Sequence, residues 1–352
     1  MPSATDLARS HARDPRTSQE ADLPLLQVLY EHPQWFASLF QELDHRGVEY
    51  QAVHAGHLHF PAVMEVEPAS SQLEQGRPRV VFNRMSPSAY LRGGSSAIRF
   101  TLTYLEALED AGVRVINGVE AYRTELSKAR QLGILGKLGL SAPRTRLAHT
   151  LEGIRGAAHE VGYPLVLKPN VGGSGAGIIR VNDSGELEQA FTALTSDTPA
   201  LQVDSTVLVQ EFVAPRGNSI VRVEVVGGRF LYAIRIHLSG ESFNLCPADV
   251  CGPPQQEMDR VCPAEAPDAG LQVEAFTPPP EVVTQVERIV AASGMELGGV
   301  EYLEREESGE VVFYDVNALS NFVADPMWVL GFDPTRQLVD FVQGVLNLPA
   351  AP

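Results

Sequence analysis

Lys168 stands at the end of an apolar run and directly before a glycine-rich stretch, in the segment PLVLKPNVGGSGAGIIRV. The glycines of this stretch allow backbone N–H groups to turn toward an anion and to approach it closely. A lysine beside such a loop adds a mobile positive charge. The segment therefore predicts a phosphate-binding loop between two strands, with Lys168 on the first strand.

Two common phosphate-binding loops do not fit this segment. The P-loop pattern GxxxxGK[ST] places its lysine after the glycines, whereas Lys168 precedes them. The dinucleotide fingerprint GxGxxG leads into a helix, but after Gly173 and Gly175 the third position is Ile178, and a strand is expected there. A glycine hairpin that covers phosphates beside a strand lysine is the arrangement that kinases use.

A second group of polar residues lies far along the chain, in the segment EVVFYDVN. The alternation of side chains along a strand predicts that Phe313, Asp315 and Asn317 share one face. The preceding predicted strand, GVEYLE, brings Glu301 alongside them. Two carboxylates and an amide oxygen are hard ligands that suit Mg²⁺ bridging nucleotide phosphates. The alternative is that they are polar residues of an edge strand that face solvent.

The elements expected before residue 122 form a small open α/β unit. Strands at 25–30, 49–53, 79–83 and 113–117 alternate with helices at 34–46 and 97–112. The segment NRMSPSAYLRGG follows a strand, which is the expected place for a ligand, and arginines there can hold a carboxylate by paired hydrogen bonds. A solvated loop is an equally good explanation. The candidate substrate residues of this segment are Arg84, Ser86, Ser88 and Arg92.

The elements expected after residue 122 surround the glycine loop and the carboxylates. Lys128 falls in the first turn of a helix at 125–140 that ends at Ala142-Pro143, and a hairpin over 219–237 turns at Gly227-Gly228. Residues 246–280, rich in Pro, Cys and Gly, are expected to form a long loop. The other expected strands are 144–148, 164–168, 177–181, 206–213, 299–304 and 310–317, and the other helices lie before 162 and at 185–194, 281–293 and 335–346.

This pattern suggests four parts. They are a disordered leader (1–22), an N-terminal α/β substrate domain (23–121), a central lid subdomain (122–212) and a C-terminal subdomain with the metal site (213–352).

The composition of the chain argues against nucleic-acid and membrane partners. The 352-residue chain has a formal net charge of −17, so it lacks the basic excess that neutralises nucleic-acid phosphates. No segment is apolar over a membrane-spanning length, and the polar first residues lack the apolar centre of a secretory signal, so a cytoplasmic protein without a membrane partner is expected. Cys246, Cys251 and Cys262 are too few for a disulfide framework and match no standard zinc spacing, and a metal site near His237 stays open.

Six segments, in their order and spacing, resemble the ATP-grasp superfamily, and most closely its branch that contains glutathione synthetase and the ribosomal-protein glutamate ligases. The resemblance runs from about Arg79 to near the C-terminus. It implies an α/β chain with the ATP-grasp fold, preceded by an open α/β pre-ATP-grasp domain. The segments are ELSKARQLGILGKLGLSAPRT, KPNVGGSGAGI, VLVQEFV, VRVEVVGGRFLYAIR, SFNL and GVEYLE…FYDVNALSNF.

The resemblance also implies roles for the matching residues. Lys128 and Lys168 match the two lysines that contact the nucleotide phosphates, and Asn244 matches a phosphate- or metal-side asparagine. Arg222 matches an arginine near the reacting phosphate and carboxylate, and Arg235 matches a second one with a shift of about one place. The loop over the phosphates is matched by Gly172, Gly173, Ser174, Gly175 and Gly177, the adenine-reading hinge by Gln210, Glu211, Phe212 and Val213, and the magnesium ligands by Glu301, Asp315 and Asn317.

The chain departs from the family pattern at three places. Glu301 and Asp315 exchange the usual Asp and Glu, which keeps both carboxylates and changes the reach of each. The acidic residue that binds the ribose after the hinge is missing, and Asn218 or Ser219 is expected to supply a weaker hydrogen bond in its place. The Pro and Gly that normally follow the metal strand are replaced by ALSNF, so the acceptor site is expected to differ, with Asn321 as a substrate candidate.

The implied activity is ATP-dependent ligation of a carboxylate to an amine through an acyl phosphate, with Mg²⁺ and with Mn²⁺ as an alternative ion. The partners are then a carboxylate donor and an amine acceptor, each an amino acid, a peptide or a specialised metabolite. A homo-oligomer is a further expectation, since relatives commonly form dimers or tetramers. Two alternatives stay open: phosphotransfer without ligation, and a non-catalytic ATP-binding regulatory domain.

Overall fold

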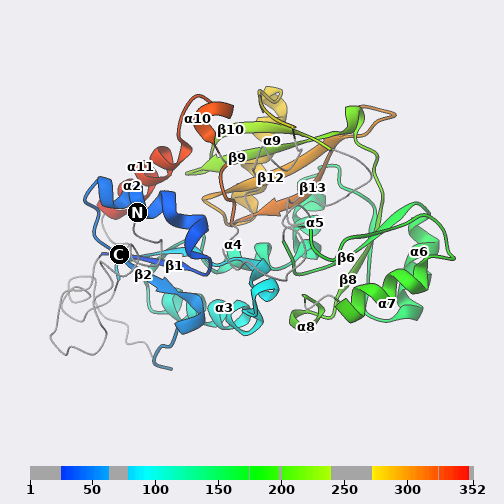
Figure 1. Ribbon diagram of the computed structural model, residues 1–352, viewed down its shortest axis with the longest axis horizontal. Coiled ribbons are helices and arrows are strands. Elements are labelled where there is room, and N and C mark those ends of the chain that lie inside the picture. The colour runs from blue at the N-terminus through cyan, green and yellow to red at the C-terminus, as the bar shows by residue number, and fades with distance from the viewer. Residues whose placement is uncertain are drawn as a thin grey trace, which may run out of the picture.

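The computed structural model describes residues 25–62, 78–173, 175–197, 200–238, 272–323 and 325–348. The expected leader, Ser174, Asn244 and the three cysteines lie outside the described residues. The described elements form three sheets with helices packed on them (Figure 1). The chain is thus an α/β protein, as the sequence predicts.

The first sheet is parallel, in the order β2-β1-β3-β4, and has both faces buried. Alternate residues enter two different cores: Leu29 and Val81 pack toward helix α3, whereas Leu26 and Phe82 pack toward helices α2 and α11. Parallel sheets need this cover on both faces, which explains the continuous apolar runs of their strands. The elements are β1 (Leu26–Tyr30), β2 (Tyr50–His54), β3 (Val80–Arg84), β4 (Arg114–Ile116), α2 (Ala37–His45), α3 (Ser95–Asp110) and α11 (Pro334–Asn347).

The last helix of the chain therefore completes the core of the first sheet. Leu338, Val339 and Val342 of α11 are buried in the same cluster as Leu26 of β1 and Leu43 of α2. In Figure 1, α11 and α2 lie side by side. This packing joins the two ends of the fold directly.

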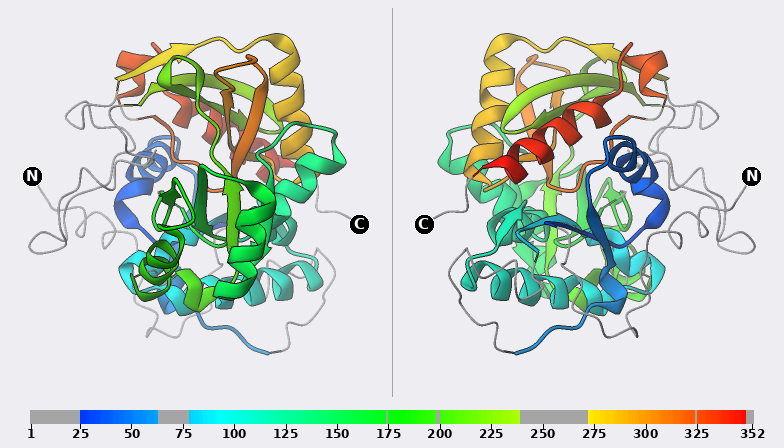
Figure 2. Two further views of the ribbon diagram at one scale, coloured as in Figure 1. Left: turned by 90° about the vertical axis from the view of Figure 1, so that its right-hand side faces the viewer. Right: turned by 90° about the vertical axis from the view of Figure 1, so that its left-hand side faces the viewer.

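The second sheet is antiparallel, in the order β5-β8-β6-β7, and carries helices α6 and α7. Strands β6 and β7 pair with each other and are joined by the glycine stretch, so the predicted strand–loop–strand hairpin is confirmed. Figure 2 shows this sheet and its helices as a separate layer below the third sheet. The elements are β5 (Thr145–Ala148), β6 (Leu165–Pro169), β7 (Ile179–Val181), β8 (Val207–Glu211), α6 (Leu151–Val161), α7 (Leu187–Asp197) and α8 (Ala200–Val203).

The third sheet is antiparallel, in the order β11-β10-β9-β12-β13, and helices α5 and α9 cover one face of it. The prediction of a loop over 246–280 is wrong near its C-terminal end. Residues 272–276 form strand β11 on the edge of this sheet, paired with β10. A five-residue edge strand shortly before three prolines gives only a weak alternation signal, and residues 246–271 of the expected loop lie outside the described residues. The elements are β9 (Ser219–Val226), β10 (Arg229–His237), β11 (Gln272–Phe276), β12 (Leu297–Glu304), β13 (Val311–Asn317), α5 (Lys128–Lys137) and α9 (Pro280–Ala292).

The helix expected at 125–140 is shorter than predicted and has a neighbour that the sequence analysis did not assign. Ser127 begins α5 as its N-cap, since its side chain accepts a hydrogen bond from the Arg130 N–H. The helix ends before Gly139, whose φ of 70° is not helical, and so it ends well before Pro143. The remaining helical segments are α4 (Val119–Glu125), α10 (Pro326–Val329), η1 (Pro33–Phe36), η2 (Ala55–His57), η3 (Pro87–Arg92) and η4 (Arg216–Asn218).

Two glycines predict opposite effects of the same substitution. A Cβ at Gly298 of β12 would collide with the backbone carbonyl oxygen of Asn317, whereas a Cβ at Gly136 of α5 meets nothing within 4 Å. We expect Gly298→Ala to lower the free energy of unfolding by about 1–3 kcal/mol. We expect Gly136→Ala to raise it by about 0.5–1 kcal/mol, because alanine favours the helix. Urea unfolding curves measure both, and equal effects would contradict the packing described for β12.

Candidate active site

One cavity of about 150 Å³ lies where the three sheets meet, and it collects polar side chains from distant parts of the chain. It brings together most of the residues that the sequence analysis assigns to phosphate, metal and substrate. Its lining consists of Trp35, Ser86, Pro87, Ser88, Glu125, Lys128, Lys168, Pro169, Gly172, Gly173, Gly175, Ala176, Ile178, Arg222, Glu301, Tyr314, Asp315, Asn317, Leu319 and Asn321.

The two lysines reach the cavity from different elements. Lys128 is the first residue of α5, and Lys168 lies in β6, directly before the glycine loop. The Lys128 ammonium contacts the Asp315 carboxylate at 2.5 Å. Burial and the positive charge of Lys128 lower the pKa of Lys168 to about 7. Burial also disfavours the charge of Lys128, but Asp315 outweighs it and raises the pKa of that ammonium above its ordinary value.

The predicted metal ligands lie on two paired strands. Glu301 of β12 is opposite Asp315 of β13, and Asn317 donates a hydrogen bond of 3.2 Å to Asp315. The register then shifts, so that Tyr314 is an extra residue between Asp315 and Phe313. This bulge turns the Tyr314 side chain to the cavity, where its hydroxyl donates to Glu301 at 2.8 Å.

The bulge also corrects one prediction. Phe313 does not share the face of Asp315 and Asn317, because it is fully buried in the opposite core, beneath α9. Simple alternation fails at this point because the bulge adds one residue to the strand. A bulge leaves no clear signal in the sequence.

The two opposed carboxylates differ in their electrostatic environment. Burial and the charge of Asp315 raise the pKa of Glu301 to about 7. Burial acts on Asp315 in the same direction, but Lys128 and Lys168 hold the pKa of Asp315 below its ordinary value. Two carboxylates thus lie close together on one wall of the cavity, with two ammonium groups beside them. A charged ligand can stabilise such an arrangement by adding opposite charge.

The glycine loop rests on the segment that follows β3. A Cβ at Gly172 would lie 3.2 Å from the Tyr90 hydroxyl, and one at Gly173 would lie 3.4 Å from the Ser88 Cβ. The approach at Gly172 is tight, so a side chain there would press against Tyr90, whereas the distance at Gly173 is an ordinary contact. Gly175 and Gly177 have φ angles of 68° and 75°, which residues with a Cβ rarely adopt.

Ser86 and Ser88 reach the cavity from the same segment, whereas the two arginines do not line it. The serine hydroxyls lie 2.8 Å apart, and Ser86 also accepts the Ser88 N–H at 3.1 Å. Arg84 is buried below the cavity and donates to the Ser320 carbonyl oxygen at 2.7 Å. Arg92 forms a bidentate pair with Glu31, at 2.8 and 2.6 Å.

Arg222 and Arg235 lie on opposite faces of the third sheet. Arg222 lines the cavity, donates to Glu224 at 2.7 Å and hydrogen-bonds the Ser320 hydroxyl. In the register Arg222 is opposite Ile234, so the next residue, Arg235, points to the other face. There its guanidinium lies 4.0 Å from the centre of the Phe276 ring. The structure therefore does not bring Arg235 to the site, and the uncertainty of one place in its match explains the difference.

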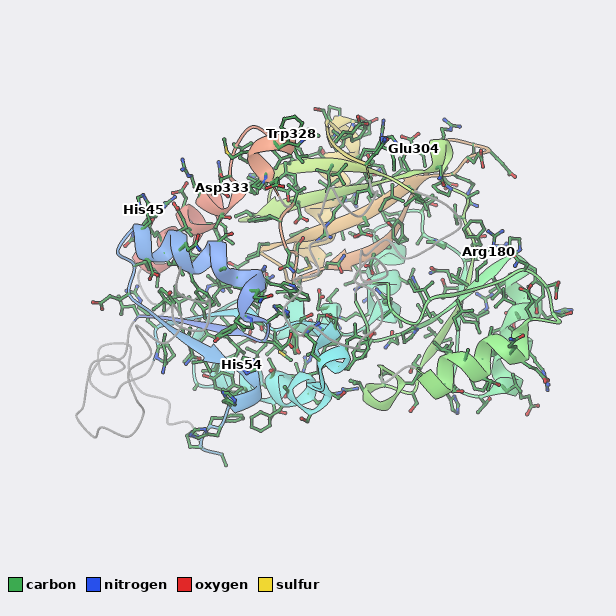
Figure 3. The ribbon with its side chains drawn as sticks, viewed as in Figure 1. His45, His54, Arg180, Glu304, Trp328 and Asp333 are labelled. Carbon is green, nitrogen blue, oxygen red and sulfur yellow. The ribbon has the colours of Figure 1, made fainter. Side chains whose placement is uncertain are left out.

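The predicted hinge links the second and third sheets. Gln210 is buried and donates to Thr145 at 2.8 Å, while Glu211 pairs with Arg144 and Arg305. Arg180 of β7, labelled in Figure 3, stacks on the Phe212 ring at 4.3 Å. Val213 is buried in a core of the third sheet.

Asn218, the predicted ribose contact, is exposed and donates to the Leu238 carbonyl oxygen at 2.6 Å. Asn218 is not among the residues that line the described cavity. Asn321 does line it, with an amide oxygen that has no hydrogen-bond partner in the described part of the chain.

Sequence reasoning missed several cavity residues. Glu125, the last residue of α4, lines the cavity, and burial raises the pKa of its carboxyl to about 7. Trp35 also lines it, stacked on His32 at 4.6 Å and covered by the Arg92 guanidinium at 4.7 Å. Both lie on short helical segments with weak periodicity, so no local pattern marks them. The other missed residues are Pro87, Pro169, Ile178, Tyr314 and Leu319.

The described residues show no other candidate centre of the expected kinds. Within them, no group of three or more His, Cys, Asp or Glu side chains is arranged to hold a metal ion, and His237 contacts Glu274 at 3.3 Å. No described helix is both long and apolar enough to cross a membrane.

Comparison with known proteins finds related ligases. Residues 126–244 match the RimK-like ATP-grasp domain. A probable alpha-L-glutamate ligase of Teredinibacter turnerae is 28% identical over 145 residues, which are 41% of this chain and 46% of that protein. A D-alanine–D-alanine ligase of Xanthomonas axonopodis pv. citri is 29% identical over 195 residues, which are 54% of this chain and 55% of that protein. The matched region thus spans about half the length of these relatives.

Solved structures match nearly the whole chain. The ATP-grasp ligase PsnB, complexed with its minimal precursor, is 21% identical with a TM-score of 0.60, over 91% of this chain and 99% of that one. The VanG D-Ala:D-Ser ligase from Enterococcus faecalis is 15% identical with a TM-score of 0.60, over 92% of this chain and 99% of that one. These likenesses agree with the arrangement of parallel and antiparallel sheets described above. The chain therefore has the fold of these ATP-grasp ligases, and its residues 126–244 are similar to the RimK-like ATP-grasp domain.

Proposed function

We propose that this protein is an ATP-dependent ligase that joins a carboxylate to an amine through an acyl phosphate. The observation that carries the proposal is the single cavity that combines two lysines, a glycine hairpin and a pair of opposed carboxylates. This set of residues serves phosphate transfer, whereas the described residues that line the cavity include no histidine or cysteine for nucleophilic catalysis.

In the first step, an oxygen of the substrate carboxylate attacks the γ-phosphorus of ATP, and the bond to the β-phosphate oxygen breaks to release ADP. Lys128 and Lys168 reach the cavity from two separate elements, so together they hold the phosphates in a fixed position. Arg222 supplies a cation that stabilises the charge developing on the transferred phosphoryl group.

The residues present fit a magnesium ion. Glu301, Asp315 and Asn317 offer oxygen ligands on one wall, and the crowding that raises the pKa of Glu301 is relieved by a cation. Bound Mg²⁺ would offset the negative charge of the phosphates. One related structure, PsnB, was solved with Mg and ADP. Mn²⁺ accepts the same oxygen ligands and is the alternative ion.

In the second step, the amine attacks the carbonyl carbon of the acyl phosphate, and phosphate leaves from a tetrahedral intermediate. Water must be excluded before this attack, since it would hydrolyse the acyl phosphate. The hairpin between β6 and β7 packs against Tyr90 and Ser88, and so closes the cavity on that side. The glycines allow this segment to open for nucleotide exchange.

The substrates are proposed from the chemistry of the relatives. Named relatives are glutamate and D-alanine ligases, and PsnB was solved with a precursor peptide. We therefore propose an amino acid or a peptide on each side of the new amide bond. The ALSNF segment places Leu319 and Asn321 in the cavity wall, so the acceptor need not be that of the relatives.

The first experiment measures ADP and phosphate release with Mg-ATP and a panel of carboxylic acids that includes L-glutamate and D-alanine. Each acid is tested alone, with a pool of amino acids, and with hydroxylamine. Release that needs both an acid and an amine, together with a trapped hydroxamate, is the expected result. Release with an acid alone would favour phosphotransfer without ligation, and tight ATP binding without turnover across the panel would favour a regulatory domain.

Removing the charges that hold the phosphates and the cation should abolish turnover without unfolding the protein. We expect Lys168→Ala and Asp315→Asn each to lower kcat at least about 100-fold, because each removes a charge at the site of phosphoryl transfer. Exposed residues give matched controls, Lys137→Ala and Asp110→Asn, which should keep full activity. Steady-state kinetics and thermal unfolding are measured on all four variants. Full activity in either site variant would contradict the assignment.

The raised pKa of Glu301 predicts a stability that depends on pH. The Glu301 carboxyl group holds its proton more tightly in the folded protein than in the unfolded chain. As pH rises from 4.5 through about 7, the carboxyl group loses this proton, and its negative charge lowers the stability of the fold. Glu301→Gln removes the charge. We expect its Tm to exceed that of the wild type at pH 8, with a smaller difference at pH 5. Glu307→Gln, at an exposed position, is the control. A difference that is the same at both pH values would argue against the crowded carboxylate pair.

A further inference from the structure

Glu125 is the cavity carboxylate that the proposed chemistry does not use. Three carboxylates line the cavity, and two of them, Glu301 and Asp315, are opposed on β12 and β13 as the proposed metal ligands. Glu125 comes instead from the end of α4, in the first half of the chain. It is only 5% exposed. A carboxylate so deeply buried requires specific partners.

The hydrogen-bond partners of Glu125 hold one of its carboxylate oxygens and leave the other without a hydrogen bond in the described part of the chain. Its Oε2 accepts hydrogen bonds from the N–H groups of Ala318 and Leu319, the two residues that follow the metal strand. Within the described part of the chain, no hydrogen bond reaches Oε1, and Oε1 is not among the buried atoms without a partner. Because Glu125 lines the cavity, Oε1 opens onto it.

Helix stability does not explain an acidic residue at this position. Glu125 is the last residue of α4, where the helix dipole disfavours a negative charge. Two cations lie near Glu125. Lys128 is in contact with Asp315 at 2.5 Å, and the buried Arg84 donates to the Ser320 carbonyl oxygen. Within the described part of the chain neither cation donates a hydrogen bond to Oε1. A neutral glutamine would accept the same two N–H groups. A carboxylate whose second oxygen opens onto the cavity therefore points to a cationic ligand at Oε1.

The neighbours of Glu125 favour an organic cation. The segment that it holds also supplies Leu319 and Asn321 to the cavity wall. An apolar side chain and an amide beside a carboxylate match an amino group attached to carbon, whereas a metal ion prefers several oxygen ligands together. In the proposed reaction, the amine substrate is the organic cation, because amines are protonated at neutral pH.

We propose, on the basis of the proposed ligase function, that Glu125 binds the ammonium group of the amine substrate through Oε1 and accepts the proton that this group must lose before its nitrogen attacks the acyl phosphate. The two backbone N–H groups orient the carboxylate, and the ALSNF segment forms the rest of the acceptor subsite. Glu125 is thus a substrate-binding residue of the second step, and the first step does not depend on it.

The test compares Glu125→Gln with Glu120→Gln, the same substitution at an exposed position of the same helix. Two nucleophiles are used with the acid identified above: hydroxylamine, which is uncharged at neutral pH, and the amino acid that the wild type accepts. For Glu125→Gln, we expect KM for the amino acid to rise about 10- to 100-fold, because a charge-assisted hydrogen bond is lost. Hydroxamate formation, the Kd for Mg-ATP and the dependence on Mg²⁺ concentration should stay within about twofold of wild type. Glu120→Gln should match wild type throughout.

Glu125→Asp is the second variant, which keeps the charge and withdraws it by one methylene. Its KM for the amino acid should lie between those of wild type and Glu125→Gln. An unchanged KM in Glu125→Gln would overturn the inference. So would an equal loss with hydroxylamine, or a shifted Mg²⁺ dependence, which would assign Glu125 to the first step or to a metal ion. If the wild type forms neither hydroxamate nor amide, the ligase function itself fails and the inference falls with it.

Discussion

The arrangement of the whole chain depends on placing charges of both signs around one small cavity. Lys128 and Lys168 face Glu301 and Asp315 in a space of about 150 Å³, largely shielded from water. Each charge alone would be costly to bury, and each is tolerated because an opposite charge is near. The Lys128–Asp315 contact neutralises a carboxylate that we propose as a ligand of the cation. In the proposed function, binding of nucleotide and cation would therefore exchange one set of ion pairs for another.

The three sheets supply these charges from rigid positions. Lys168 lies in a strand whose five residues are all buried, and Glu301 and Asp315 lie on paired strands of another sheet. Lys128 begins a helix that packs on that second sheet. The glycine hairpin rests on Ser88 and Tyr90, in the segment that follows β3. A fixed frame with a glycine-rich cover suits the proposed reaction, which must admit nucleotide and then exclude water.

Much of this arrangement could be predicted from the sequence, because strong local patterns encode it. The lysine before the glycine stretch predicts a hairpin, and the structure pairs β6 with β7. The alternation in EVVFYDVN correctly places Asp315 and Asn317 together, with Glu301 on the neighbouring strand. The parallel first sheet follows from apolar runs separated by helices.

The rest depends on contacts that no local pattern records. The bulge at Tyr314 moves Phe313 to the opposite face, and a shift of one place moves Arg235 out of the site. Glu125 and Trp35 enter the cavity from short segments whose position is fixed by packing. Arg92 is at its expected place, yet its guanidinium is held by Glu31, so a motif alone could not decide what it binds.

The packing of α11 on the first sheet has a consequence for how the chain is made. Leu26 of β1 is synthesised more than three hundred residues before Leu338, which shares its core. While the chain grows on the ribosome, one apolar face of the first sheet lacks this cover until the last helix emerges. Contacts between residues so far apart in the sequence form late, and the hydrophobic surface that they cover stays exposed until then. The core around the first strand of the chain is therefore among the last to be completed.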